Sequence, residues 1–194
     1  MRDKVDKNAH YFWAVQLPDG IKQNIQDEML NLKQVFQFQR WVHMSDFHIT
    51  LAFLGSMDLQ RQHTVIDLVS NAIKDERAFK LQIQGINTFG NQKSPRIFWS
   101  AVNHDRRLFQ LQSIIHEKCQ EAGFTLETRP YHPHITLARK WNGNDEFNME
   151  LLEKYNPFHE KPLSFLADKI VLYKTNLEKI PKYEPIKTFT LVVD

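Results

Sequence analysis

Two copies of the tetrapeptide His-Ile-Thr-Leu carry the residues best suited to chemistry, one starting at His48 and the other at His134. In an extended strand, side chains at positions i and i+2 point to the same face, so each copy presents an imidazole beside a threonine hydroxyl. Imidazole titrates near neutral pH, which lets one histidine accept a proton while the other donates one. The pair predicts two-histidine acid–base catalysis.

A tetrahedral phosphate suits this pair of motifs. In-line displacement at phosphorus needs a base that activates the nucleophile and an acid that protonates the leaving oxygen. The hydroxyls of Thr50 and Thr136 can donate hydrogen bonds to the non-bridging oxygens, where negative charge develops. The sequence therefore predicts a phosphoesterase that needs neither a metal nor another cofactor.

A zinc site is the alternative use of these histidines. His132 and His134 stand two residues apart, and His43 or His48 could supply a third nitrogen ligand. No Asp, Glu or Cys stands within either tetrapeptide to complete the ligand set or to act as a base. The metal interpretation is therefore the less favoured one.

The spacing of the two motifs indicates an internal duplication. They are 86 residues apart, and the same interval separates Phe12-Trp13 from Phe98-Trp99. A pattern of hydrophobic residues at helical spacing over 21–36 also overlies one over 107–122. These matches predict an α+β fold of two lobes related by a pseudo-twofold axis, with a cleft between them.

The predicted lobes belong to a single domain covering 1–194, with sequence repeats at about 11–86 and 97–173, because no Gly/Ser-rich linker divides them. Alternating or continuously apolar runs predict strands at 11–17, 48–54, 79–86, 96–102, 134–138, 163–173 and 186–193. Helices are predicted at about 19–37, near 65–73 and near 108–122, with a short helix that Asn144 or Asp145 caps and that carries Phe147, Leu151 and Leu152.

Composition narrows the class of protein. The 194 residues are 42% hydrophobic and 25% charged, with a net charge of +2, so a globular domain is expected rather than a strongly basic nucleic-acid coat. Cys119 is the single cysteine, which excludes an intrachain disulfide. No apolar run is long enough for a bilayer and no signal-peptide pattern follows Met1, so we expect a cytoplasmic protein, without membrane contact and monomeric.

Longer stretches around the motifs resemble the 2H phosphoesterase superfamily, and within it the RNA 2′,3′-cyclic phosphodiesterases, historically called 2′–5′ RNA ligases. The similar stretches are Phe12-Trp-Ala-Val-Gln-Leu-Pro18, His48-Ile-Thr-Leu-Ala-Phe-Leu-Gly55, His132-Pro-His-Ile-Thr-Leu-Ala-Arg139, Ile170-Val-Leu-Tyr-Lys-Thr175 and Tyr183-Glu-Pro185. The resemblance covers nearly the whole chain. It implies two lobes, each an antiparallel sheet backed by helices, around a central cleft.

The resemblance also implies roles for further residues. Arg139 matches the family's arginine after the second motif and would pair with phosphate. Trp13 falls where the family has an aromatic residue near the substrate base, on which a base could stack. Ala52 departs from the pattern, because the family often has a lysine there, and the missing charge would alter substrate affinity or preference.

The implied activity is hydrolysis of an RNA or nucleoside 2′,3′-cyclic phosphate to a 2′-phosphate, reversible in principle as 2′–5′ ligation without ATP. The near-symmetric motifs do not say which histidine is base and which is acid; analogy favours His134 as base and His48 as acid. Two alternatives stay open. One is a phosphodiesterase for a small cyclic nucleotide or a 2′–5′ oligonucleotide, and the other is a non-catalytic module that binds RNA ends.

Overall fold

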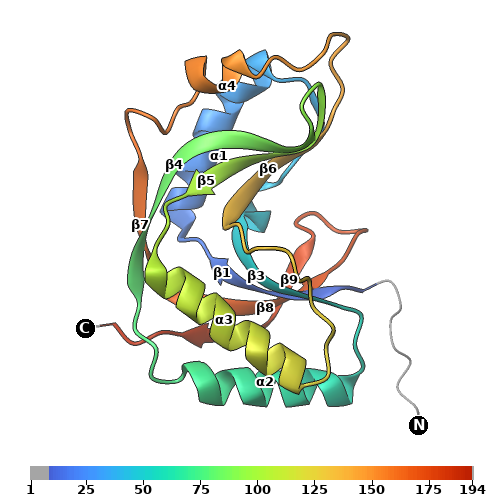
Figure 1. Cartoon of the computed structure of the whole chain (residues 1–194), viewed down its shortest axis with the longest axis vertical. Helices are drawn as coiled ribbons and strands as arrows, with labels where there is room; N and C mark the ends of the chain where they lie inside the picture. Colours follow the sequence, from blue (N-terminus) through green and yellow to red (C-terminus); the bar gives the residue numbers. More distant parts are fainter. Residues whose placement is uncertain (1–8, 194) are drawn as a thin grey trace.

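The computed structural model describes residues 9–193, which fold into two antiparallel sheets with helices packed on them (Figure 1). The four-stranded sheet has the order β3 (His48–Gly55), β1 (Tyr11–Gln16), β8 (Lys169–Thr175) and β9 (Tyr183–Thr190). The five-stranded sheet has the order β2 (Phe38–Trp41), β6 (His134–Trp141), β5 (Ser94–Val102), β4 (Phe79–Asn91) and β7 (Leu163–Ala167). The α+β class with two antiparallel sheets is thus confirmed.

The helices follow from the hydrophobic spacing. They are α1 (Asp19–Val35), α2 (Leu59–Ile73), α3 (Arg106–Glu121), the short α4 (Glu150–Lys154) and one turn of 3₁₀ helix, η1 (Met44–Asp46). In α1 the buried residues Ile25, Met29 and Leu32 recur at intervals of four and three and form one apolar stripe. Figure 1 shows α2 and α3 along the four-stranded sheet and α1 behind the five-stranded sheet.

Each sheet takes strands from both halves of the chain. The motif strands follow the duplication, since β1 pairs with β3 and β5 pairs with β6. However, β2 and β4 come from the first half and join the sheet of β6, whereas β8 and β9 come from the second half and join the sheet of β3. The two sheets are therefore not the two contiguous sequence repeats.

The strands β3 and β6 carry a β-bulge at the same place. The register of β3 against β1 shifts after Thr50, so Leu51 has no partner on β1. The register of β6 against β5 shifts after Thr136, so Leu137 has no partner on β5. The freed carbonyls find other donors: the side-chain amide of Gln112 reaches Leu51 at 3.3 Å, and a backbone N–H reaches Leu137 at 2.9 Å. Such bulges bend a strand and redirect the side chains that follow.

Several boundaries differ from the sequence predictions. The region 163–173 holds two strands in different sheets rather than one, because the chain leaves β7 at Asp168 and enters β8. The helix expected after Asn144 begins only at Glu150, and Phe147 is buried ahead of it. The strand β2 was not predicted at all. Its four residues are too few to show an alternating pattern, and they follow closely on the end of the helix α1.

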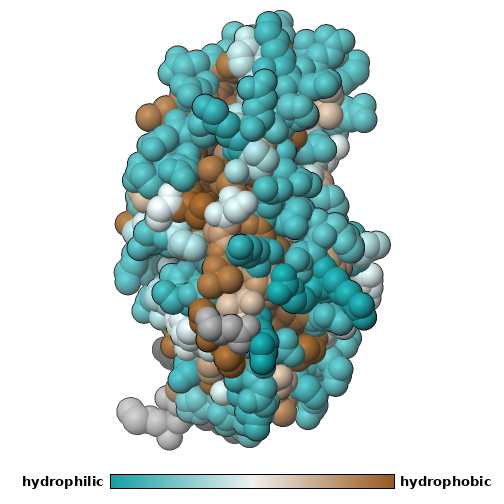
Figure 2. All heavy atoms as spheres, turned by 90° about the vertical axis from the view of Figure 1, so that its left-hand side faces the viewer, coloured by the Kyte–Doolittle hydropathy of each residue, from teal (hydrophilic) through white to brown (hydrophobic). Residues whose placement is uncertain are grey.

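One large hydrophobic cluster lies between the sheets and their helices, and a small second one contains Phe12, Ala14, Val171 and Tyr173. Figure 2 shows a largely hydrophilic surface crossed by a band of hydrophobic side chains on the face turned toward the viewer. Within residues 9–193 no helix combines the length and apolar character needed to cross a membrane.

Candidate active site

His48 is held in one orientation by its own backbone. It starts β3 directly after η1, and its Nδ1 lies 2.7 Å from the carbonyl oxygen of Asp46, two residues earlier. A carbonyl can only accept, so Nδ1 carries a hydrogen. In the neutral ring Nε2 is then the basic nitrogen, and it lies 3.1 Å from Oγ1 of Thr50. The imidazole therefore directs its proton-exchanging atom toward the motif's hydroxyl.

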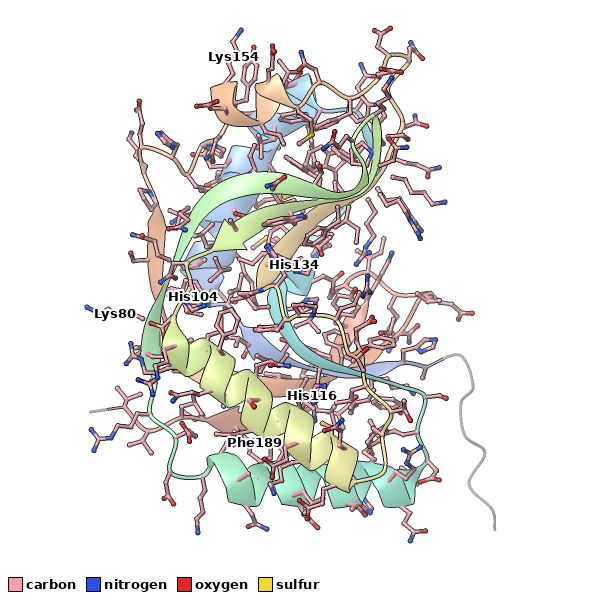
Figure 3. All side chains as sticks on the ribbon, in the orientation of Figure 1. Lys80, His104, His116, His134, Lys154 and Phe189 are labelled. Atoms are coloured by element: carbon pink, nitrogen blue, oxygen red, sulfur yellow. The ribbon has the colours of Figure 1, made fainter. Side chains whose placement is uncertain are left out.

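His134 repeats this arrangement 86 residues later. Its Nδ1 lies 2.7 Å from the carbonyl oxygen of His132, again two residues earlier, so Nε2 is again the basic nitrogen of the neutral ring. Figure 3 shows His134 in the middle of the molecule, between the two sheets. Both copies of the motif thus hold the neutral imidazole in the same tautomer.

Aromatic rings surround each imidazole. Phe12 lies 4.8 Å from His48 between ring centroids, and Tyr183 meets the same ring edge-on at 5.1 Å. On the other side, Phe89 and Trp99 lie 5.1 and 5.8 Å from His134. Rings of this kind exclude water and so disfavour the charged form of an imidazole.

Both histidines have lowered pKa values. The pKa of His48 is lowered to about 4: burial is the main cause, the hydrogen bond to the carbonyl of Asp46 opposes it, and His134 and Arg139 contribute smaller decreases. Burial also lowers the pKa of His134, with added repulsion from His132 and Arg139. Both imidazoles are therefore neutral at neutral pH in the free protein. The influence of His134 and Arg139 on His48 also indicates that the two motifs meet at one site.

The low pKa of His48 makes folding stability depend on pH. The unfolded chain binds a proton near pH 6.5, whereas the folded chain binds it only near pH 4. Stability from this residue is therefore complete above pH 6.5 and falls as the pH drops toward 4, by about 3 kcal/mol in all. We expect urea unfolding to show this loss between pH 7 and 4 in the natural chain.

The variant His48→Asn should reduce that slope, since it removes one of the two histidines whose pKa is lowered in the folded protein. The exposed His63 on α2 provides the matched control, and His63→Asn should keep the slope of the natural chain. Equal pH slopes in His48→Asn and the natural chain would contradict the assignment.

The bulge at Leu137 brings Arg139 to the site. In a regular strand a residue five positions after His134 would point to the opposite face. Because Leu137 is an extra residue, Arg139 returns to the face of His134 and Thr136. The first motif has Phe53 at the corresponding position, and it is 55% exposed. The site therefore has one cationic side, supplied by the second motif.

Arg139 contacts the wall of His48 as well. Burial raises the pKa of Tyr183, whereas the charge of Arg139 and a hydrogen bond to Arg139 partly oppose this increase. Arg139 therefore lies near Tyr183 and both imidazoles, where its guanidinium could reach an anion bound at the two motifs. The phosphate-binding role that the resemblance implied for Arg139 stays a prediction.

Trp13 lies elsewhere than the sequence comparison implied. Its side chain is fully buried and stacks on Phe189 at 5.8 Å, so it has no surface on which a base could stack, contrary to the prediction. Trp13 pairs with Ala52 while its neighbour Phe12 packs on His48, so alternation along β1 turns Trp13 away from the site. The two motifs also differ in register on their partner strands. Thr50 pairs with Ala14 whereas Thr136 pairs with Trp99, so the 86-residue offset that holds for the motifs becomes 85 on the partner strands. A slip of one residue moves a side chain to the other face.

Ala52 is also explained by the bulge. It follows the unpaired Leu51, pairs with Trp13, and is 5% exposed within the main hydrophobic cluster. A small apolar residue fits this environment without cost, since a charged group there would need a partner.

Asp46 is a component of the site that the sequence did not reveal. Its carboxylate is almost fully buried and accepts the backbone N–H groups of Lys182, at 2.9 and 3.0 Å, and Tyr183, at 3.0 Å. Its carbonyl oxygen holds His48. One residue thus fixes both the imidazole and the ring that packs on it. The only sequence signal was its place two residues before the motif, equivalent to His132.

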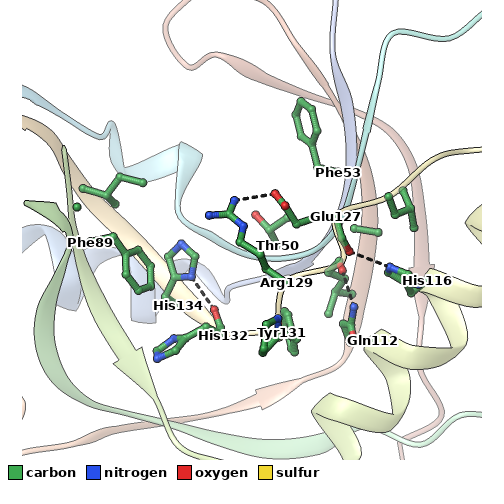
Figure 4. A pocket seen from close by; sticks show the side chains of 16 residues that line it. Thr50, Phe53, Phe89, Gln112, His116, Glu127, Arg129, Tyr131, His132 and His134 are labelled. Carbon is green, nitrogen blue, oxygen red and sulfur yellow. Dashed lines mark hydrogen bonds and ion pairs between the residues drawn. The ribbon is translucent and has the colours of Figure 1, made fainter.

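A cavity of about 570 Å³ opens beside the two motifs and includes Thr50 and His134 in its wall (Figure 4). It extends past Phe53 and Phe89 toward α3 and the segment before β6. Arg129 lies at this segment and forms an ion pair with Glu127 at 2.7 Å. A volume of this size is typical of small-ligand sites. His134 lines the cavity, whereas His48 does not and is packed against Phe12 and Tyr183.

Buried polar atoms without partners also lie near the cavity. The hydroxyl of Tyr131, which lines it, and Nε1 of Trp99 have no hydrogen-bond partner, and burial raises the pKa of Tyr131. Among residues 9–193, no group of three or more His, Cys, Asp or Glu side chains is arranged to hold a metal ion.

Comparisons with known proteins agree with the fold and the motifs. Residues 25–179 match the family model described as the 2′-5′ RNA ligase superfamily. The chain is 34% identical over 186 residues to an RNA 2′,3′-cyclic phosphodiesterase of Bacillus subtilis, covering 96% of this chain and 98% of that protein. It is 39% identical over 186 residues to an RNA 2′,3′-cyclic phosphodiesterase of Geobacillus stearothermophilus, covering 96% of this chain but only 58% of that longer protein.

Among solved structures, the fold is similar to that of Escherichia coli LigT complexed with 3′-AMP, with a TM-score of 0.78 and 22% sequence identity over 94% of this chain and 98% of the other. Fold and site together define a two-histidine phosphoesterase architecture. The chain belongs to the 2′-5′ RNA ligase superfamily.

Proposed function

We propose that this protein hydrolyses the 2′,3′-cyclic phosphate of an RNA end or nucleoside and leaves a 2′-phosphate. The observation that carries the proposal is the pair of duplicated imidazoles, each with Nδ1 bound to a carbonyl two residues earlier and Nε2 left for proton transfer. The relatives in B. subtilis and G. stearothermophilus, which bear the name RNA 2′,3′-cyclic phosphodiesterase, support the same substrate class.

The reaction needs two proton transfers. One imidazole takes a proton from water as the water oxygen attacks phosphorus, and the bond from phosphorus to O3′ breaks. The other imidazole donates its proton to O3′, which leaves the phosphate on O2′. Both rings are neutral in the free protein, so the acid must gain its proton when the anionic phosphate enters and offsets the cost of charging a buried ring.

The remaining motif residues would bind the phosphate. The hydroxyls of Thr50 and Thr136 lie on the same faces as the histidines and can donate to the non-bridging oxygens. Arg139 can add a charge-assisted, bidentate contact. In the reverse direction, an RNA 5′-hydroxyl in place of water would attack the same phosphorus and give a 2′–5′ linkage without ATP.

The direct test is to incubate the purified protein in excess EDTA with a short RNA ending in a 2′,3′-cyclic phosphate. We expect conversion to a 2′-phosphate at an unchanged rate, because no step of the mechanism uses a metal. Digestion and chromatography against 2′- and 3′-phosphate standards identify the product.

Either of two results would count against the proposal. A 3′-phosphate product would mean that O2′ is the leaving group. Loss of activity in EDTA that zinc restores would favour the metal site considered for His132 and His134.

A further inference from the structure

A second arginine stands beside Arg139 and has no role in the chemistry described above. Arg40 on β2 pairs directly with Arg139 on β6. Residues directly opposite each other in an antiparallel pair have their Cα atoms about 5 Å apart and point to the same face. The side chain of Arg40 is exposed, whereas that of Arg139 is partly buried. The two guanidinium groups thus extend from one face at the edge of the site.

This placement is unfavourable unless an anion is present. Like charges directly opposite on neighbouring strands destabilise a sheet. In the described part of the chain neither Arg40 nor Arg139 takes part in any of the ion pairs with carboxylates. The neighbouring pairs on the same two strands, such as Phe38 with Trp141, are uncharged.

The backbone next to the pair is also unusual. Lys140 follows Arg139 with φ of 61°, the left-handed conformation that side chains other than glycine rarely adopt. Strain of this kind persists where the surrounding structure requires it, often at sites that bind ligands. Here it lies one residue after Arg139, between the two residues of β6 that pair with Arg40 and Phe38 on β2.

We propose that Arg40 binds a second phosphate group, the phosphodiester adjacent to the cyclic phosphate that Arg139 holds. The proposal rests on the proposed function and narrows it: the preferred substrate is an oligonucleotide rather than a mononucleotide. Guanidinium groups are well suited to phosphate because they form paired hydrogen bonds, and an exposed one contributes through charge without a large desolvation cost. The scissile phosphate and its neighbour together neutralise the arginine pair.

The test compares two substrates, a nucleoside 2′,3′-cyclic phosphate and a dinucleotide or longer RNA with the same end. In Arg40→Met the value of kcat/KM for the oligonucleotide should fall about tenfold, which corresponds to one lost phosphate contact. This factor should be at least about five times the factor by which kcat/KM falls for the mononucleotide. The slope of log kcat/KM against log salt for the oligonucleotide should decrease by about 0.7. Arg106→Met, at an exposed arginine at the start of α3, is the matched control.

Two results would overturn the proposal. An equal loss for both substrates would mean that Arg40 acts on the scissile phosphate or through Arg139. No loss for either would make Arg40 an ordinary solvated charge.

Failure of the proposed function is distinguishable, because it appears in the natural chain as no turnover of either substrate. In that case binding replaces turnover as the measurement. The affinities of the natural chain and of Arg40→Met are compared for an oligonucleotide and for a mononucleotide, each ending in a 2′-phosphate, and the loss in Arg40→Met should again be larger for the oligonucleotide.

Discussion

Replacing His48 or His134 with alanine is expected to lower kcat on a 2′,3′-cyclic phosphate by a factor of about 10² to 10⁴, since each ring supplies one of the two proton transfers. The double variant should be little slower than either single one, because the two groups act as a unit and their effects are not additive. Steady-state rates on the same RNA substrate measure both effects.

Controls separate chemistry from folding. His48→Ala also removes ring contacts with Phe12 and Tyr183, so its unfolding transition must be measured beside its activity. His63→Ala changes an exposed histidine on α2 and should leave the rate unchanged. Near-normal turnover by either single motif variant, in a folded protein, would rule out two-histidine catalysis.

Replacing Arg139 with methionine is expected to lower kcat/KM by about 10- to 100-fold, since hydrogen bonds to charged groups contribute about 1.5–3 kcal/mol each. Methionine keeps an unbranched apolar chain but removes the guanidinium. Arg139→Lys should recover only part of the activity, because an ammonium group cannot reproduce the bidentate contact.

The same variant should change the titration of both histidines. The charge of Arg139 lowers the pKa of His48 and of His134, so its removal should raise both values toward 6.5. NMR titration of the imidazole signals measures the shifts without any need for turnover. Unchanged histidine pKa values would show that Arg139 does not face the two rings, whereas Arg106→Met should leave them as they are in the natural chain.

The sequence was most informative where a short pattern is repeated. The two His-Ile-Thr-Leu motifs and the helices α1 and α3 lie where the 86-residue interval placed them, because hydrophobic periodicity is a local property. The pairing of the neighbouring strands was less predictable. A bulge is created by pairing between strands, so a single strand's sequence does not show it, and the interval failed on β1 and β5.

Contacts between distant parts of the chain were the least predictable. The carboxylate of Asp46 binds backbone N–H groups 136 and 137 residues away, and no periodicity connects them. For Arg139 the sequence offered only its resemblance to a family. By alternation alone it would face away from His134, and only the extra residue in β6 reverses this. Pairing between strands thus decides which side chains reach the site.

The exchange of strands between the two halves has a consequence for motion. The chain passes from one sheet to the other four times, from β1 to β2, β2 to β3, β3 to β4 and β7 to β8. Domains that open and close around a ligand usually rotate about a few residues in one or two connections. Here four crossings join the sheets, and the crossing from β2 to β3 is held to the start of β9 by the N–H groups that Lys182 and Tyr183 donate to Asp46. We infer that the spacing of the two imidazoles is set when the protein folds, and that substrate enters a preformed site rather than one assembled by domain closure.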